Sequence, residues 1–314
     1  MAMPGFHPSL RQLRRTHSTK YPRTRTHDVP HAHPVEIEVR RTYQLETLGE
    51  AQLLDTQRAF DSVAADYDGP RGNNALIQRM RLTLWDTVRR EVPTGSRLLD
   101  LGCGTGIDAV EFASRGYPVV ASDWSPGMVE RTRLRAEAVG MEERVQAVHV
   151  GVHQLDQLEG SFGGIYSNFG PLNCAPDMAA VANQCARLLQ PGGKLVLSVI
   201  GRICPWEVGY YLFKGRLKRA SIRATRGATA VGMNRHTIWT HYYLPREFYR
   251  AFAPHFSLNG YRALSLFMPP PYLVDFYERH QTGCEWLGKL DDRFGAWPLL
   301  RDMGDHFLIV MQRR

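Results

Sequence analysis

The chain has 314 residues, of which 43% are hydrophobic, and a net charge of +8, so it can bury one sizeable core. Its longest apolar runs stay well short of the ~20 residues that a membrane-spanning helix needs, and residues 1–30 lack the apolar stretch of a secretory signal. Five cysteines that form no C-x-x-C pair argue against a disulfide framework, so we expect a cytoplasmic protein.

Residues 1–40 differ in composition from the rest of the chain. Residues 1–27 carry six Lys and Arg, no acidic residue and no apolar periodicity. Such a segment cannot bury enough surface to offset the entropy of ordering, so we expect a disordered basic tail, with an organellar transit peptide as the alternative. Its histidines match no compact set of metal ligands, and we expect no metal site. One domain is predicted for residues 41–314, with N-terminal helices within 41–93.

A glycine-rich turn follows the first predicted strand. The apolar residues before Asp100 predict a short, buried parallel strand, and the apolar spacing from Ile107 onward predicts a helix. Between them lie Gly102, Gly104 and Gly106. Glycine has no Cβ and lets a ligand lie against the backbone, while the start of the helix directs free N–H groups toward that ligand. The segment predicts a nucleotide-type site; the alternative is a purely structural turn.

The second predicted strand ends on a carboxylate. The short apolar run at 118–122 leads to Asp123, about twenty residues after the glycines, where a carboxylate can bind both hydroxyls of a ribose. Ser125 and Pro126 then predict the start of a helix, because serine caps helices and proline fits their first turn.

Five further strands are predicted along the chain. The third lies at 144–150, the fourth with its loop at 162–170, and the fifth with its preceding turn at 187–201. The sixth lies at 256–268 and an antiparallel seventh at 306–312.

Three motifs closely resemble those of the class I S-adenosylmethionine (SAM)-dependent methyltransferases. They are DLGCGTG at 100–106, DWSPGM at 123–128 and the L-x-P-G-G-x-L pattern at 189–195. The resemblance is close over residues 95–200. It implies an α/β fold of the Rossmann-like type: a doubly wound, mainly parallel seven-stranded sheet with helices on both faces. It also implies SAM as the cofactor and S-adenosylhomocysteine as the product.

The resemblance further implies which residues bind the cofactor. They belong to the glycine turn, the end of the second strand, the helix after it, the loops after the third and fourth strands, and an F-D-x-x-A-x-x-Y-D pattern at 60–68. These residues are Tyr67, Asp100, Gly102, Cys103, Gly104, Thr105, Gly106, Asp123, Trp124, Met128, His153, Gln154, Asn168 and Phe169. The chain departs from the family after the third strand, where GVHQL replaces the usual acid. There His153 or Gln154 can accept the hydrogen bond of the adenine amino group instead.

An aromatic and basic insertion at 201–255 follows the fifth strand. Residues 201–250 hold ten Lys and Arg against two acids, and they are rich in Trp, Tyr and Phe. Their pattern predicts a helix over 205–220, a strand over 237–244 and a helix over 245–252. With PPPYL at 269–273, we expect the insertion to form a lid over an apolar or aromatic acceptor, and its positive charge favours an anionic one.

Methyl transfer to a hydroxyl or carbon also needs a general base. Glu207, just beyond the fifth strand, and His241, within the aromatic strand, are the two candidates. The acceptor atom (O, N, C or S) and the oligomeric state stay open.

The sequence predicts a methyltransferase that acts on a small-molecule or lipid acceptor, and peripheral membrane contact is compatible with its charge. A nucleic-acid methyltransferase is less favoured, because residues 168–173 lack the double proline that base-modifying relatives use. An aminopropyl transferase would need paired aspartates where Ser167 and Asn168 stand. A catalytically silent SAM-binding subunit is the remaining alternative.

Overall fold

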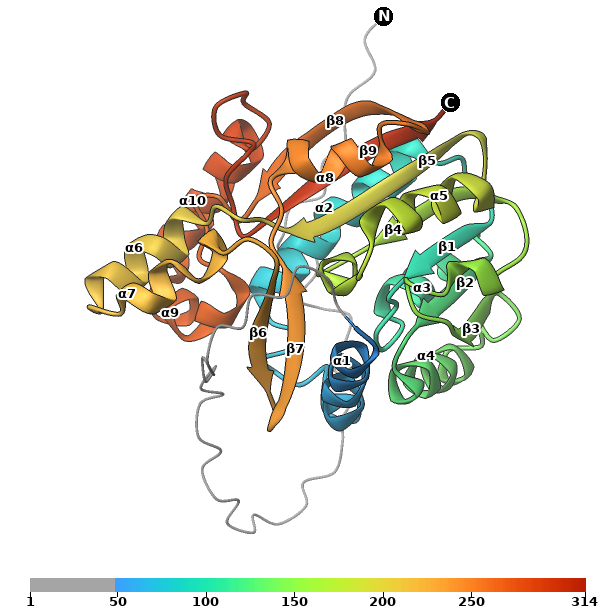
Figure 1. Ribbon diagram of the computed structural model, residues 1–314, viewed down its shortest axis with the longest axis horizontal. Coiled ribbons are helices and arrows are strands. Elements are labelled where there is room, and N and C mark those ends of the chain that lie inside the picture. Colours follow the sequence, from blue (N-terminus) through green and yellow to red (C-terminus); the bar gives the residue numbers. More distant parts are fainter. Residues whose placement is uncertain (1–48) are drawn as a thin grey trace, which may run out of the picture. The chain divides into compact units, whose positions relative to one another are not determined.

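Six strands that run in one direction and a seventh that runs against them form the central sheet in the computed structural model, which describes residues 49–314 (Figure 1). The predicted tail at 1–40 lies outside the described residues. The sheet order is β3-β2-β1-β4-β5-β9-β8, and β9 runs antiparallel to both of its neighbours. The strands are β1 (Leu98–Leu101), β2 (Val119–Asp123), β3 (Val145–His149), β4 (Phe162–Ser167), β5 (Leu189–Ile200), β8 (Phe256–Leu264) and β9 (His306–Arg313). The predicted α/β fold is confirmed.

Helices cover both faces of this sheet. The α-helices of the described residues are α1 (Glu50–Val63), α2 (Ala75–Glu91), α3 (Ile107–Ser114), α4 (Pro126–Ala138), α5 (Met178–Leu188), α6 (Pro205–Phe213), α7 (Leu217–Ala220), α8 (Pro245–Phe252), α9 (Val274–Arg279) and α10 (Gln281–Phe294), and those that cover the sheet are α2, α3, α4, α5 and α8. Ser125 caps α4 as predicted, since its hydroxyl accepts a hydrogen bond from the Met128 amide at 3.1 Å. None of the helices within residues 49–314 is long and apolar enough to cross a bilayer.

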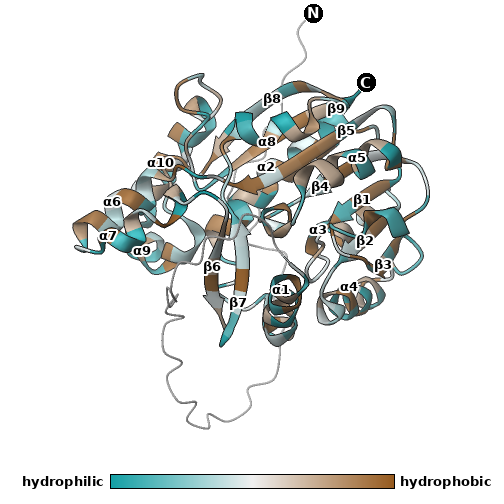
Figure 2. Cartoon of the chain, viewed as in Figure 1, coloured by the Kyte–Doolittle hydropathy of each residue, from teal (hydrophilic) through white to brown (hydrophobic). Residues whose placement is uncertain are grey.

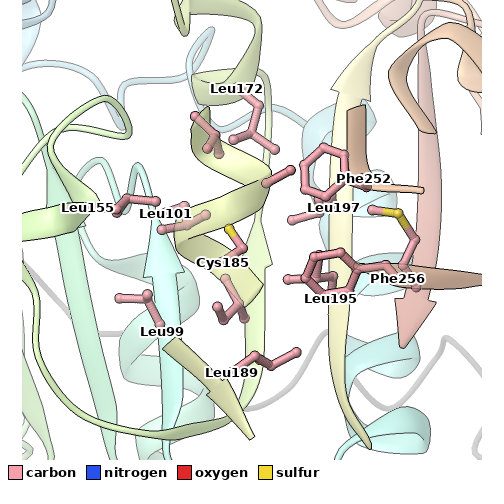
Figure 3. Packing of buried hydrophobic residues seen from close by; sticks show 14 of the residues in the cluster. Leu99, Leu101, Leu155, Leu172, Cys185, Leu189, Leu195, Leu197, Phe252 and Phe256 are labelled. Carbon is pink, nitrogen blue, oxygen red and sulfur yellow. The ribbon is translucent and has the colours of Figure 1, made fainter. Parts of the chain in front are cut away.

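Two apolar clusters hold the layers together. On one face, α5 and α8 pack on β1, β4, β5 and β9, with Leu99, Leu197 and Phe252 fully buried (Figure 3). On the other face, α2, α3 and α4 pack against the same strands through Leu84 and Phe112. Figure 2 shows the apolar character of the central strands. Because both faces are covered, the strands are apolar along their length, and loops at the carboxyl edge are left to form a site.

The insertion differs from its prediction in two places. The helix expected over 205–220 is divided, because Gly215 takes a φ of +67° and ends α6. The amides of Gly215 and Arg216 bond to the Leu212 and Tyr211 carbonyls, which is the Schellman pattern of a helix end. The predicted helix at 245–252 is α8.

A two-stranded hairpin, β6 (Ala228–Met233) and β7 (His236–His241), forms where one strand was expected. Asn234 and Arg235 both have positive φ at its tip, as a two-residue hairpin turn requires. The hairpin lies beside α1 (Figure 1), and the Trp239 amide donates to the Thr56 hydroxyl at 3.2 Å.

A buried charge network ties the insertion to the sheet. Arg223 follows α7 in a short 3₁₀ turn, η4 (Ile222–Ala224), and its guanidinium bonds Glu207 of α6 at 2.8 Å and Asp305 before β9 at 2.6 Å. Tyr272 also donates to Glu207, at 2.8 Å, from the 3₁₀ turn η5 (Pro271–Leu273). Both carboxylates depend on this one cation, since all three charged groups are buried.

We expect Arg223→Met to lower the free energy of unfolding by about 3–5 kcal/mol, because it leaves two buried carboxylates without their counter-ion. Arg226→Met is the matched control, since Arg226 is exposed, and it should change stability by less than about 0.5 kcal/mol. Urea denaturation measures both values. Equal effects of the two substitutions would show that the network does not anchor the insertion.

Candidate functional site

A cavity opens at the carboxyl edge of the parallel strands. Its walls come from α1, α2, the glycine turn, the end of β2 and the loop after β4. Most of the predicted cofactor residues line it: Tyr67, Gly102, Cys103, Gly104, Thr105, Asp123, Trp124, Met128, His153, Asn168 and Phe169. This edge is where ligands bind in open α/β sheets.

Two glycines of the turn are required for different reasons. Gly102 has a φ of +77°, and a Cβ built on it would lie 2.2 Å from Pro171. Gly104 has a φ of +55°, but a Cβ there would meet nothing within 4 Å. Gly102 therefore lets the turn pack against the loop after β4, whereas Gly104 leaves bare backbone beside the open cavity.

Asp123 at the end of β2 is joined to this turn. Its carboxylate accepts hydrogen bonds from the Gly104 amide at 2.8 Å and the Ser125 amide at 2.9 Å. Burial raises the pKa of Asp123 to about 6, although the two amides oppose the shift. Its carboxylate is thus fixed in direction, and oxygen lone pairs that the amides do not use can accept from a ligand.

A polar chain holds Tyr67 at the mouth of the turn. The neighbouring Asp68 accepts from the Thr105 hydroxyl at 2.8 Å and pairs with Arg135, which in turn donates to the Thr105 carbonyl at 2.7 Å. Burial, and next the charge of Asp123, raise the pKa of Tyr67 to about 12. Tyr67 therefore stays a neutral phenol that can donate or stack.

A second polar cluster lines the opposite wall. Arg81 of α2 pairs with Asp108 of α3 at 2.5 Å, and Trp85 and Asn168 donate to the same carboxylate at 2.7 and 3.0 Å. Two buried atoms of this cluster have no partner in the described part of the chain: Nε of Arg81 and Oδ1 of Asn168. Both residues line the cavity, and a buried donor and a buried acceptor without partners are suited to a polar ligand.

Three predicted cofactor residues do not line the cavity. Asp100 is buried below the turn, where Tyr166 donates to it at 3.0 Å and burial raises its pKa. Gly106 faces Thr132 of α4, so its missing Cβ serves helix packing. The Gln154 amide turns back to accept from the Gly151 amide at 3.3 Å, which leaves His153 as the side chain beside Trp124, at 4.7 Å between ring centroids.

The structure does not bring either predicted general base to this cavity. Glu207 was expected there because it follows β5, but its carboxylate points into the ion network with Arg223. His241 stacks on Tyr243 with 6.1 Å between ring centroids, and only its backbone oxygen contacts the loop after β4, through Asn173 at 2.6 Å. Neither side chain is among the residues that line the cavity.

Several cavity residues were missed by sequence reasoning. They are Leu53, Thr56, Gln57 and Phe60 of α1, together with Arg81 and Asp108. The α1 residues form an ordinary amphipathic pattern, and a basic residue on a helix is usually exposed. The distinguishing feature of Arg81, its pairing with Asp108, depends on how α2 packs on α3.

Residues 98–193 match the model of a family described as "Methyltransferase domain". Among curated relatives, the ubiquinone biosynthesis O-methyltransferase of Xylella fastidiosa (strain 9a5c) is 34% identical over 152 residues, which is 48% of this chain and 59% of the relative. The demethylmenaquinone methyltransferase of Clavibacter sepedonicus is 34% identical over 141 residues, which is 44% of this chain and 55% of the relative. The chain thus spans about three fifths of the curated relatives that it matches.

A solved structure shares the fold. It is the 1,6-didemethyltoxoflavin-N1-methyltransferase of Burkholderia thailandensis, solved with 1,6-didemethyltoxoflavin and S-adenosylhomocysteine bound. The similarity covers 87% of this chain and 94% of that chain, with a TM-score of 0.51 and 18% identity.

Gly102→Ala and Gly104→Ala should differ in their cost to stability. Both place a side chain at positive φ, which costs about 1–3 kcal/mol, but only Gly102→Ala adds a collision with Pro171. We expect Gly102→Ala to unfold at clearly lower urea concentration than Gly104→Ala. A larger loss for Gly104→Ala would contradict the assigned roles.

Proposed function

We propose that the chain is a class I SAM-dependent methyltransferase that transfers the methyl group of SAM to a small organic acceptor of the quinone or phenol type. The observation that carries this proposal is the cavity itself, which is lined by the glycine turn, Asp123, Arg81 and Asn168.

The cavity suits each part of the cofactor. Asp123 would accept hydrogen bonds from the ribose hydroxyls, because two backbone amides hold its carboxylate in one direction. Nε of Arg81 would donate to the methionine carboxylate, and Oδ1 of Asn168 would accept from the ammonium group. Trp124 and His153 offer ring surface to the adenine. The bound sulfonium supplies an activated methyl group, so the protein must mainly align the acceptor with it.

The acceptor class rests on the named relatives and on the surface of the insertion. The two curated relatives act in quinone biosynthesis by name. In this chain Leu212, Phe213 and Leu217 are 50%, 90% and 68% exposed beside Lys214 and Lys218. Exposed apolar side chains among basic ones suit contact with an anionic lipid surface, where an apolar quinone is found. We retain the predicted role of residues 201–255 as a lid as part of this proposal, although none of them is among the described residues that line the cavity.

Tritium-labelled SAM tests the proposal directly. We expect the protein to transfer label to catechol, a minimal hydroxylated ring, and not to a single-stranded RNA. Arg81→Met should weaken S-adenosylhomocysteine binding about 10- to 100-fold, because it removes a charged donor, whereas exposed Arg226→Met should not. Calorimetry measures the affinities. Label found in RNA would favour the nucleic-acid alternative, and no binding of S-adenosylhomocysteine would refute the proposal.

The affinity for S-adenosylhomocysteine should depend on pH through Asp123. Its pKa of about 6 means that the carboxylate is charged at pH 8 and mostly protonated at pH 5. The charged form is the stronger acceptor, so we expect affinity to fall as the pH is lowered through 6. Asp123→Asn cannot ionise, so its affinity should be weaker at pH 8 and nearly flat over this range. A wild-type profile as flat as that of Asp123→Asn would contradict this role.

A further inference from the structure

We propose that His306, oriented by Asp305, is the general base that takes the proton from the acceptor hydroxyl. The inference rests on the proposed function. Like Glu207 and His241, His306 is not among the residues that line the cavity, but its ring contacts Phe169, which does line it. The inference starts from one observation: Nε2 of His306 is buried and has no hydrogen-bond partner in the region that the structure describes.

His306 lies at the edge of the sheet where the cavity opens. It is the first residue of β9 and pairs with Ile200, the last residue of β5. The carboxyl ends of the parallel strands meet at this edge. Its imidazole stands edge to face against Phe169, with 6.1 Å between centroids and 87° between planes, and Phe169 lines the cavity. One aromatic ring therefore contacts both the cavity and the imidazole.

The hydrogen bond to Asp305 selects the tautomer of the neutral His306 ring. Nδ1 lies 2.8 Å from Oδ2 of Asp305, whose Oδ1 receives Arg223 at 2.6 Å. Burial opposes the charge of Asp305, but Arg223 and then His306 hold the pKa of that carboxyl below its usual range. An ionised carboxylate requires the proton of the neutral ring to be on Nδ1, which leaves the lone pair on Nε2. The other polar groups of this network, Glu207 and Tyr272, bond to Arg223 or to each other.

Phe169 is the group that must move. It has a φ of +57°, a conformation that costs a non-glycine residue energy and is found at functional sites. Its ring contacts His306 on one side and the Arg81 guanidinium at 5.0 Å. It also packs against the edge of the apolar cluster of Leu84 and Phe112. An aromatic acceptor that takes the place of this ring brings its hydroxyl to Nε2 without disturbing the Asp305 bond.

The proton and electron balance is simple. The acceptor oxygen forms a bond to the methyl carbon, the carbon–sulfur bond breaks, and its electron pair goes to sulfur, giving the neutral thioether. The hydroxyl proton passes to Nε2, and Asp305 stabilises the imidazolium until it releases the proton to water.

The acidity of the acceptor tests this role. His306→Asn retains a donor for Asp305 but cannot take a proton, so its kcat with catechol should fall ~100-fold or more. With 4-nitrocatechol, which the nitro group ionises near neutral pH, we expect a loss below ~10-fold, since no base is needed. His255→Asn, at a half-buried histidine bonded to Asn183, is the control and should match the wild type with both substrates. Affinity for S-adenosylhomocysteine should be unchanged in both variants.

Equal losses of His306→Asn with the two catechols would overturn the inference, because a structural defect does not distinguish acceptor acidity. If the wild type binds S-adenosylhomocysteine but methylates neither catechol, the proposed acceptor class fails first. The ring tautomer then decides the inference: ¹⁵N NMR of histidine-labelled protein, assigned with His306→Asn, should show a proton on Nδ1 and none on Nε2 at pH 7.5. A proton on Nε2 would refute the assignment.

Discussion

The hydrogen bond from the Gly104 amide to Asp123 joins the ends of β1 and β2 and determines what the carboxyl edge of the sheet can bind. It requires the backbone of the turn to approach a side chain on the next strand, which positive φ at Gly104 permits. It also fixes the carboxylate in one direction. The floor of the cavity is therefore set by backbone geometry, and the other walls are added around it.

Those walls come from segments far apart in the sequence. The α2–α3 contact supplies the buried pair of Arg81 and Asp108, and the loop after β4 supplies Asn168 and Phe169. Behind Phe169, Asp305 connects the sheet edge to the insertion through Arg223. A single buried cation thus stabilises the insertion and orients the imidazole of His306, so stability and chemistry depend on the same charge.

The sequence was most informative where function depends on backbone conformation. The alternating glycines, Asp123 and the Ser125 cap are local patterns, and the structure has the sheet, the turn and the helix that they predict. It was least informative in the insertion, where Gly215 divides the expected helix and β6 was not foreseen. The direction of the Glu207 carboxylate depends on Arg223, sixteen residues away, and no spacing rule links the two. The partners of Arg81 and His306 likewise come from tertiary packing.

The helix α1 illustrates a consequence of building a cavity wall from a weakly anchored element. Only Thr56 and Ala59 of α1 are buried, yet four of its residues line the cavity. It is held by the packing of Leu53 against the hairpin and by polar contacts, among them Asp61 with the Gly127 amide at 3.0 Å. A ligand in the cavity contacts α1 only while this helix is docked on the domain. Ligand binding therefore stabilises the docked state and suppresses local opening of α1 by mass action. By the same coupling, we expect product release to depend on the local opening of α1.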